Sequence, residues 1–416
     1  MLEHFFRSKF LISHLRGNPG AELLDAFCGH LIDCGYSRSQ GCRHLRAVAH
    51  LLYWQDQEGH GLTVTDPDCI GLFIQHLDKC CCDGFIGMHQ PKLLRGIRAF
   101  RSYLLGQPLS TAAHRHPRIE VASPLWVPFC CWMREQRGIS VRTLSDYYHY
   151  LQPLLRDIYD DPSKIDVAYL RQFMLQLGRK GGNARAKSTT SALRMFVRFL
   201  IAQGRCTAGL DEAIPSVAYW RLSSLPQYLQ PEEVERVISS PDMQTSVGKR
   251  DRAILLLLAR LGLRAGEVVN LCLTDIDWHG ATIRVCGKNK RQTLLPLTQE
   301  VGDAIVDYLQ HGRPPTASQR VFIRALAPFR PYRDTRGVSD VAKLALRRAQ
   351  VNAPSRGAAH VLRHSMATSM LRQSVSLNDI SAVLRHTCLS STEIYAKVDI
   401  PALQELAQPW PEAQSC

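Results

Sequence analysis

The first 225 residues repeat apolar side chains at helical spacing and contain almost no strand signal. Three apolar faces stand out: Leu23, Phe27 and Leu31; Leu45, Val48 and Leu52; and Phe73, Ile74 and Leu77. A helix with one apolar stripe must bury it, and another helix is the simplest cover. We therefore expect this part of the chain to form helical bundles.

A weak internal repeat divides this helical region in two. Three stretches of the first half match three of the second: residues 27–37 with 129–140, residues 73–77 with 173–177, and residues 98–107 with 194–203. The offset between the matched stretches shrinks along the chain, as small deletions after a duplication would produce. Two interpretations stay open, a duplicated bundle and the general likeness of small helical bundles.

Two segments without apolar periodicity, residues 108–117 and residues 215–226, are candidate linkers, and each begins and ends with proline. A chain of 416 residues is also too long for one compact core. We expect three parts: an N-terminal helical region over residues 1–115, a second helical domain over residues 118–207, and a C-terminal domain over residues 225–410.

The C-terminal part mixes helical and alternating periodicity. Pro231 followed by two acidic residues predicts the first turn of a helix. The apolar run at residues 253–259 predicts a strongly buried helix that ends at Gly262. Ser376 opens a capping box before a further helix.

A β-hairpin with a basic tip is predicted between these helices. Residues 282–285 alternate as a strand, residues 287–291 turn the chain, and residues 294–297 return. Residues 321–323 predict a third short strand. The expected fold is mainly α with a small antiparallel β-sheet, in which a mixed α+β domain follows one or two helical bundles.

Composition narrows the class of partner. The 51 lysines and arginines exceed the 37 acidic residues and give a net charge of +14, spread along the chain, which favours a polyanionic partner such as nucleic acid. The longest apolar run is far shorter than a membrane helix, and basic residues interrupt the N-terminus where a secretory signal would be apolar. None of the 14 cysteines has C-x-x-C spacing, so we expect no metal site, reduced thiols and a cytoplasmic location.

Four short segments of the C-terminal part hold basic residues whose type folding does not require, and one tyrosine follows them. In chain order these residues are Arg264, Lys288, His360, Arg363, His386 and Tyr395. Here the sequence resembles the tyrosine recombinase family, also called phage integrases, whose catalytic domain carries Arg, Lys, His-x-x-Arg, His or Trp, and Tyr in this order. The resemblance covers residues 228–400 and, more loosely, residues 118–207, which are similar to the family's DNA-clamping, SAM-like core-binding domain.

The resemblance implies that Tyr395 attacks a DNA phosphodiester and forms a 3′-phosphotyrosyl bond, which stores the energy for rejoining without metal, ATP or another cofactor. The transition state is highly anionic, so two fixed guanidiniums would stabilise it, and Arg264 and Arg363 match the family's arginines. Lys288 matches the lysine that protonates the leaving 5′ oxygen. By the same resemblance, His360 bonds the phosphate and accepts or relays the tyrosine proton, and His386 donates to a non-bridging oxygen.

Three positions depart from or extend the common family pattern. The hairpin tip is shorter by a glycine, so Lys290 competes with Lys288 for the same role. Arg385 stands where a glycine often precedes the histidine, and Glu267 matches an acidic position that we interpret as a buried support. Taken singly, each site residue also has a structural interpretation, such as Arg264 paired with Glu267.

Other basic residues are candidate DNA contacts. Five of them lie around the last helix of the second bundle, which faces the major groove in family members, and one lies at the hairpin tip: Lys180, Arg185, Lys187, Arg194, Arg198 and Lys290. The alternative for each is a solvated helix face.

The sequence thus predicts a site-specific recombinase or integrase of a transposable element. Double-stranded DNA is the expected partner, and the resemblance implies a homotetramer on DNA, or an assembly with sister recombinases. One alternative is a resolvase or topoisomerase-like enzyme with the same tyrosine chemistry. Another is a catalytically idle DNA-binding accessory protein, against which the complete six-residue set argues.

Overall fold

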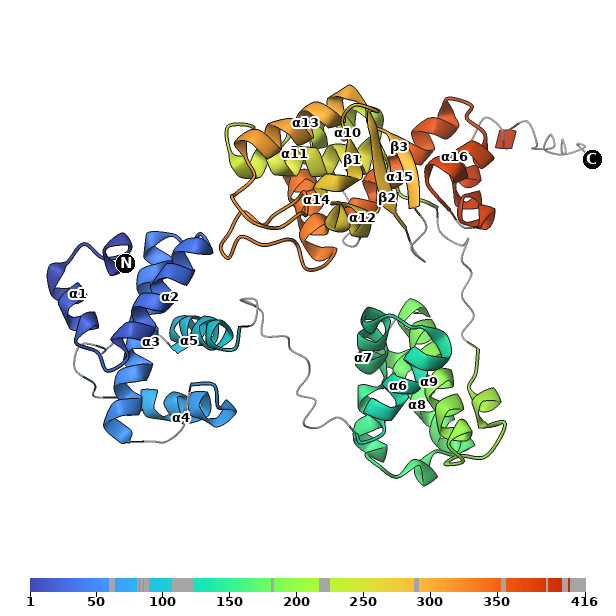
Figure 1. Ribbon diagram of the computed structural model, residues 1–416. Helices are drawn as coiled ribbons and strands as arrows, with labels where there is room; N and C mark the ends of the chain where they lie inside the picture. The colour runs from blue at the N-terminus through green and yellow to red at the C-terminus, as the bar shows by residue number, and fades with distance from the viewer. Residues whose placement is uncertain are drawn as a thin grey trace, which may run out of the picture. The chain divides into compact units, whose positions relative to one another are not determined.

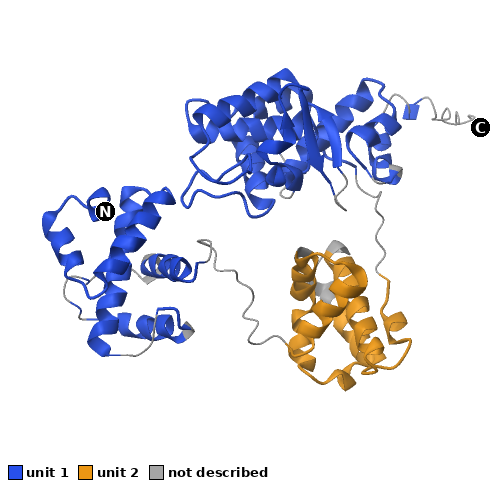
Figure 2. Cartoon of the chain, in the orientation of Figure 1, with its two compact units in different colours: residues 1–111, 224–416 blue, residues 112–223 orange. Residues whose placement is uncertain are grey.

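The computed structural model describes residues 1–59, 64–80, 82, 85, 90–106, 123–180, 183–216, 225–287, 292–352, 357–386, 388–398 and 403–404. The chain divides into two compact units (Figure 2). One unit comprises Met1–Thr111 together with Ser224–Cys416, and the other comprises Ala112–Ser223. No helix in the described ranges is long and apolar enough to span a lipid bilayer.

The N-terminal region is helical, as the periodicity predicts. Its elements are η1 (Leu2–His4), α1 (Lys9–Arg16), α2 (Ala21–Asp33), α3 (Arg38–Glu58), α4 (Pro67–Leu77) and α5 (Gln90–Leu104) (Figure 1). Leu45 and Val48 of α3 are fully buried, as expected. Leu23 is 41% exposed, so its place in the predicted stripe is wrong. The buried stripe of α2 consists of Leu24, Phe27, Cys28 and Leu31. Each residue turns the helix by about 100°, so Leu24 lies on the buried side and Leu23, one position earlier, lies at its edge.

The second unit is a helical bundle with its own apolar core. It contains α6 (Trp126–Arg137), α7 (Val141–Ile158), η3 (Pro162–Lys164), α8 (Val167–Lys180), α9 (Asn183–Ala202) and η4 (Leu210–Ala213). Phe129, Leu151, Leu193 and Phe196 are fully buried in this core. The unit therefore has a core of the kind that an independently folding domain needs.

The matched stretches of the internal repeat have similar local structures in the two bundles. Gly35 and Gly138 both adopt positive φ, 74° and 57°, just after a helix. Ser37 and Ser140 are the N-caps of the next helices, α3 and α7.

One aromatic pair is also repeated. Phe27 contacts Phe100 edge to face at a centroid distance of 5.1 Å, and Phe129 contacts Phe196 in the same way at 5.2 Å. Both partners of each pair come from matched stretches of the sequence.

The C-terminal part combines helices with a small sheet. Its helices are α10 (Pro231–Ser239), α11 (Ser246–Ala259), α12 (Ala265–Asn270), η5 (Leu273–Asp275), α13 (Gln299–His311), α14 (Arg336–Arg348), α15 (Ala358–Arg372), α16 (Leu377–Val383), η7 (Leu389–Ser391) and η8 (Glu393–Val398). The strands β1 (Ile276–Asp277), β2 (Thr282–Cys286) and β3 (Gln292–Pro296) form an antiparallel sheet in the order β1-β2-β3. The predicted fold class, mainly α with a small antiparallel sheet, is confirmed.

The predicted hairpin is confirmed, with Cys286 opposite Gln292 next to the turn. The predicted third strand at Val321–Ile323 is wrong. Ile323 forms only an isolated bridge with Pro331, and the third strand of the sheet is β1. Residues 321–323 are fully buried, and a short apolar run gives the same sequence signal in a buried loop as in a strand.

Local capping signals in this part are borne out. Pro231 is the first residue of α10, and Gln230 and Glu233 complete a reciprocal capping box. The hydroxyl of Ser376 accepts a hydrogen bond from the backbone N–H of Asp379 at the start of α16. The apolar run in α11 is buried throughout, and this helix is the centre of the C-terminal core.

Candidate active site

The turn after α11 is built around Gly262. Its φ of 56° lies in the left-handed region, and a Cβ here would approach the sulfur of Met366 to 2.8 Å. Its carbonyl oxygen accepts hydrogen bonds from the guanidiniums of Arg363 and Arg385. Only glycine fits this turn without strain. The turn places the carbonyl oxygen of Gly262 where both arginines can donate to it.

Arg264 follows this turn and caps α12. Its backbone N–H and its guanidinium both donate to the carboxylate of Glu267, at 2.8 and 2.9 Å. The Glu267 side chain is 4% exposed, whereas that of Arg264 is 33% exposed. The buried carboxylate therefore fixes the position of the arginine and leaves part of the guanidinium accessible to solvent. The pairing with Glu267 and a role in the site are compatible.

Arg363 lies in the middle of α15 and is one of the largest fully buried side chains. Its guanidinium donates to the carbonyl oxygens of Gly262 and Leu384. Burial, followed by the charges of Arg264 and Arg385, lowers the pKa of Arg363 to about 9. An anion would relieve this repulsion, because it would compensate charge that the protein leaves uncompensated.

Arg385 is a third guanidinium in the cluster. It donates to Glu267 at 2.9 Å, while its Nε atom has no hydrogen-bond partner among the described residues. Its φ of 55° explains why glycine is common at this position in the family pattern. Among the described residues, Glu267 is the one carboxylate bonded to these arginines, so the cluster carries excess positive charge.

Glu267→Gln is therefore expected to destabilise the C-terminal part by about 3 kcal/mol, because it leaves the nearly buried Arg385 and the partly exposed Arg264 without their counter-charge. The midpoint of urea unfolding would measure the loss. Glu300→Gln is a matched control: Glu300 pairs with Arg260 but is 42% exposed, so about 1 kcal/mol or less is expected. Equal effects of the two substitutions would contradict a buried supporting role.

Tyr395 lies in η8 and is 1% exposed, packed against Leu371, Ile380 and Leu384. Its hydroxyl lies 2.8 Å from Nδ1 of His364. Burial, partly opposed by Arg363 and Arg264, raises the pKa of Tyr395 to about 12. The tyrosine is therefore neutral near pH 7, and its hydroxyl is within hydrogen-bond distance of the imidazole.

The two histidines of α15 contact each other edge to face, and one of them contacts this tyrosine in the same way. The rings of His360 and His364 are 4.4 Å apart, and the His364 ring is 5.5 Å from that of Tyr395. Burial, followed by the charges of His360 and Arg363, lowers the pKa of His364 to about 3. His364 is therefore neutral near pH 7, and its Nδ1 can accept the tyrosine proton.

His386 approaches the cluster from the turn after α16. Its Nδ1 lies 2.8 Å from the hydroxyl of Thr392, which is fully buried. Burial, followed by the charges of Arg363 and Arg264, lowers the pKa of His386 to about 4. A neutral imidazole can donate one N–H to a phosphate oxygen without adding charge.

Five of the predicted catalytic residues thus gather around one positively charged site: Arg264, His360, Arg363, His386 and Tyr395. Lys288 and Lys290 lie outside the described residues, between β2 and β3. Sequence reasoning assigned no role to His364 or Thr392. The position of His364 directly after Arg363 was an available signal, but nothing local marked Thr392.

The candidate DNA contacts on α9 differ in their surroundings. Arg185 and Lys187 are exposed. Arg194 donates to the carbonyl of Ile214, and Arg198 pairs with Asp211 at 2.7 Å, so both tie α9 to the segment around η4. The backbone of Lys180 ends α8, and its side chain lies outside the described residues. These contacts to DNA stay predictions.

The mainly helical fold, with arginines and histidines gathered around one buried tyrosine, defines the tyrosine recombinase class. Residues 227–400 match the Phage integrase family. The chain is 36% identical to the integrase/recombinase y4rA of Sinorhizobium fredii over 99% of this chain and 100% of that protein. It is 27% identical to the tyrosine recombinase XerC of Anoxybacillus flavithermus over 65% of this chain and 91% of that protein. The protein belongs to the phage integrase family of tyrosine recombinases.

Solved structures show the same fold. A lambda integrase dimer bound to a core site covers 70% of this chain and 98% of its own, with a TM-score of 0.51 and 19% identity. A lambda integrase tetramer bound to a Holliday junction covers 79% and 91%, with a TM-score of 0.51 and 16% identity.

Proposed function

We propose that the protein is a site-specific DNA recombinase that cleaves and rejoins DNA strands through a 3′-phosphotyrosyl bond at Tyr395. The observation that carries this proposal is the excess of guanidinium charge beside the hydroxyl of Tyr395. Arg264 and Arg385 share one carboxylate, Glu267, whereas the hydrogen bonds of Arg363 go to the backbone carbonyls of Gly262 and Leu384. A phosphodiester is an anion, and its charge increases in the transition state of attack by an oxygen nucleophile.

The residues of the candidate active site have the following roles in the proposed reaction. Arg264 and Arg363 bond the non-bridging oxygens of the scissile phosphate, and His386 donates to one of them. The Tyr395 oxygen attacks phosphorus, and the bond to the 5′ oxygen of the next nucleotide breaks. His364 or His360 takes the tyrosine proton. The reverse attack by a 5′ hydroxyl restores the phosphodiester, so neither ATP nor metal is consumed.

The burial of Tyr395 implies a switch in this proposal. At 1% exposure its hydroxyl cannot reach a phosphate on a DNA duplex, and Arg363 is buried to the same extent. The segment at residues 388–398 must therefore shift before attack, which breaks its apolar packing on Leu371 and Leu384 and its hydrogen bonds to His364 and His386. Binding of DNA and assembly with neighbouring protomers would supply that shift.

Lys288 is proposed as the general acid that protonates the leaving 5′ oxygen. We expect Lys288→Ala to cleave an ordinary strand about 100-fold more slowly, or slower still. Cleavage should recover on a 5′-bridging phosphorothiolate, because sulfur leaves without a proton. Lys290→Ala is the matched control from the same hairpin tip, and rescue of that variant alone would assign the acid to Lys290.

The proposed partner is double-stranded DNA, held by the helical bundles, with a homotetramer or sister recombinases completing the assembly. The net charge of +14 and the lambda integrase tetramer on a Holliday junction support this proposal.

The N-terminal region is proposed to be a duplicated clamp-like bundle. The shared glycine turns, N-caps and Phe–Phe pairs of the two bundles support the duplication.

Covalent trapping tests the proposed function. Nicked suicide duplexes drawn from the DNA that flanks the gene are incubated with the protein in chelator and resolved on SDS gels. We expect a DNA-linked species that resists denaturation, and peptide mapping should place the DNA on Tyr395. Salt-sensitive binding without any adduct, also after addition of candidate partner recombinases, would favour the accessory role.

A further inference from the structure

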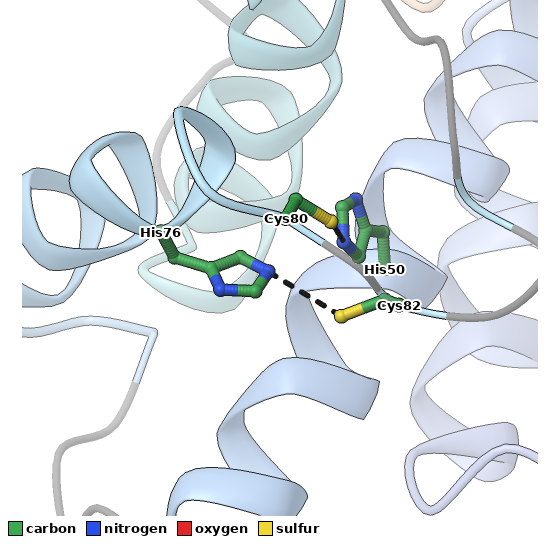
Figure 3. Close-up of side chains that lie close together, drawn as sticks. All are labelled: His50, His76, Cys80 and Cys82. Atoms are coloured by element: carbon green, nitrogen blue, oxygen red, sulfur yellow. Dashed lines mark hydrogen bonds between the residues drawn. The ribbon is translucent and has the colours of Figure 1, made fainter.

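A cluster of four metal-ligating side chains lies in the N-terminal region, outside the recombinase site. His50, His76, Cys80 and Cys82 direct one nitrogen or sulfur atom each toward a common centre (Figure 3). These four atoms lie within 4.8 Å of one another.

The distances fit a mononuclear site. The Cys80 sulfur is 3.3 Å from Nε2 of His50, and the Cys82 sulfur is 3.4 Å from Nε2 of His76. A tetrahedral zinc ion with ordinary Zn–S and Zn–N bonds separates its ligand atoms by about 3.3 to 3.8 Å. The widest separation therefore needs to close by only about 1 Å, which rotation of a cysteine side chain can supply.

Packing fixes the imidazole of His50 in this position. The ring is 1% exposed and stacks on Phe85 at 4.7 Å with an interplanar angle of 3°. It also contacts Phe73 at 5.1 Å and His76 at 5.6 Å. A ring held by its neighbours loses little conformational entropy when it becomes a ligand.

The chemistry of the set selects zinc. Two thiolates and two neutral imidazoles are a common ligand set of structural zinc sites. Two thiolates also neutralise a dication, so burial of the complete site places no net charge inside the bundle. Each thiol releases one proton when the metal binds.

The ligands come from two helices and the segment that follows the second. His50 lies on α3, His76 lies in the last turn of α4, and Cys80 and Cys82 follow α4 directly. In the internal repeat, the position of His76 is occupied by Gln176. The cluster is therefore a property of the N-terminal bundle and not of the shared bundle design.

We propose that His50, His76, Cys80 and Cys82 bind one structural Zn²⁺ ion that ties the end of α4 to α3. The lack of C-x-x-C spacing among the cysteines predicted no metal site. The ligands instead follow the pattern H-x3-C-x-C, with the fourth ligand on an earlier helix.

Cobalt titration of the full chain tests this proposal. The protein is stripped with a chelator, kept reduced, and titrated with Co²⁺ as the probe. We expect one equivalent to give the intense visible bands of a tetrahedral site and thiolate-to-cobalt charge transfer in the near ultraviolet, both of which Zn²⁺ then removes. A weakly coloured octahedral spectrum without charge transfer would overturn the proposal, and this measurement needs no variant.

Two variants and a control locate the site. Cys80→Ser/Cys82→Ser should lose the charge transfer and retain about one tenth or less of the zinc of the wild type. His76→Gln, which copies the second bundle, should weaken binding by roughly 100-fold. Cys34→Ser is the control, because Cys34 also contacts a histidine, His30 at 3.6 Å, without belonging to the cluster. Wild-type metal content in the double variant would overturn the assignment.

Discussion

Replacement of Tyr395 by phenylalanine is expected to abolish covalent attachment to DNA completely while leaving DNA binding within about 2-fold of the wild type. The substitution removes only the nucleophilic oxygen. The ring stays buried in the same apolar contacts, and the lost hydrogen bond to His364 costs about 1 kcal/mol. Adduct formation on suicide duplexes and a gel-shift titration with the same DNA measure the two effects.

Tyr308→Phe is the matched control for this experiment. Tyr308 is also 1% exposed in the same unit, and its hydroxyl accepts a hydrogen bond from the backbone N–H of Ile323. Removal of either hydroxyl therefore has a similar structural cost, but Tyr308→Phe should still form the adduct. A covalent species in Tyr395→Phe would remove this residue from the nucleophile role.

Arg264→Ala is expected to slow strand cleavage by about 100- to 1,000-fold, the range for loss of one preorganised charge at an anionic transition state. The guanidinium is anchored by Glu267 yet one-third exposed, so it can reach a phosphate and its removal leaves no large cavity. Single-turnover cleavage at saturating protein isolates the chemical step from DNA binding.

Arg260→Ala separates this effect from a general loss of positive charge or stability. Arg260 lies four residues earlier, is 29% exposed, and pairs with Glu235 and Glu300. Its exposure is similar to that of Arg264, but its carboxylate partners are exposed, whereas Glu267 is buried. We expect cleavage within about 3-fold of the wild type. Similar losses in both variants would show that Arg264 acts through folding alone.

The departure at Arg385 has a physical explanation in the structure. Its backbone adopts φ of 55°, where an arginine is strained and glycine is not. The side chain offsets this strain by bonding Glu267 and the carbonyl of Val383. An arginine here adds positive charge to the site.

Much of the fold was predictable because its signals are local. Apolar residues at helical spacing predict α3 and α4, alternation predicts β2, and Pro231 and Ser376 mark helix starts. These signals depend on the geometry of a few neighbouring residues, so no knowledge of distant contacts is needed. The wrong prediction of a third strand at Val321–Ile323 shows the limit of these local signals. A short apolar run indicates that a segment is buried, but it does not indicate whether the segment is a strand or a loop.

The catalytic set was likewise indicated by the order and spacing of its residues, but the tertiary structure decided how they are arranged. Arg363 of α15 lies near Arg264 because its guanidinium donates to the carbonyl oxygen of Gly262, two residues before Arg264. The contact of Tyr395 with His364 joins residues 31 positions apart, and burial raises the pKa of this tyrosine. His50 and Cys80 are 30 residues apart and meet only through helix packing. Sequence determines which side chains are present and their local conformation, whereas proximity, desolvation and pKa depend on the packed fold.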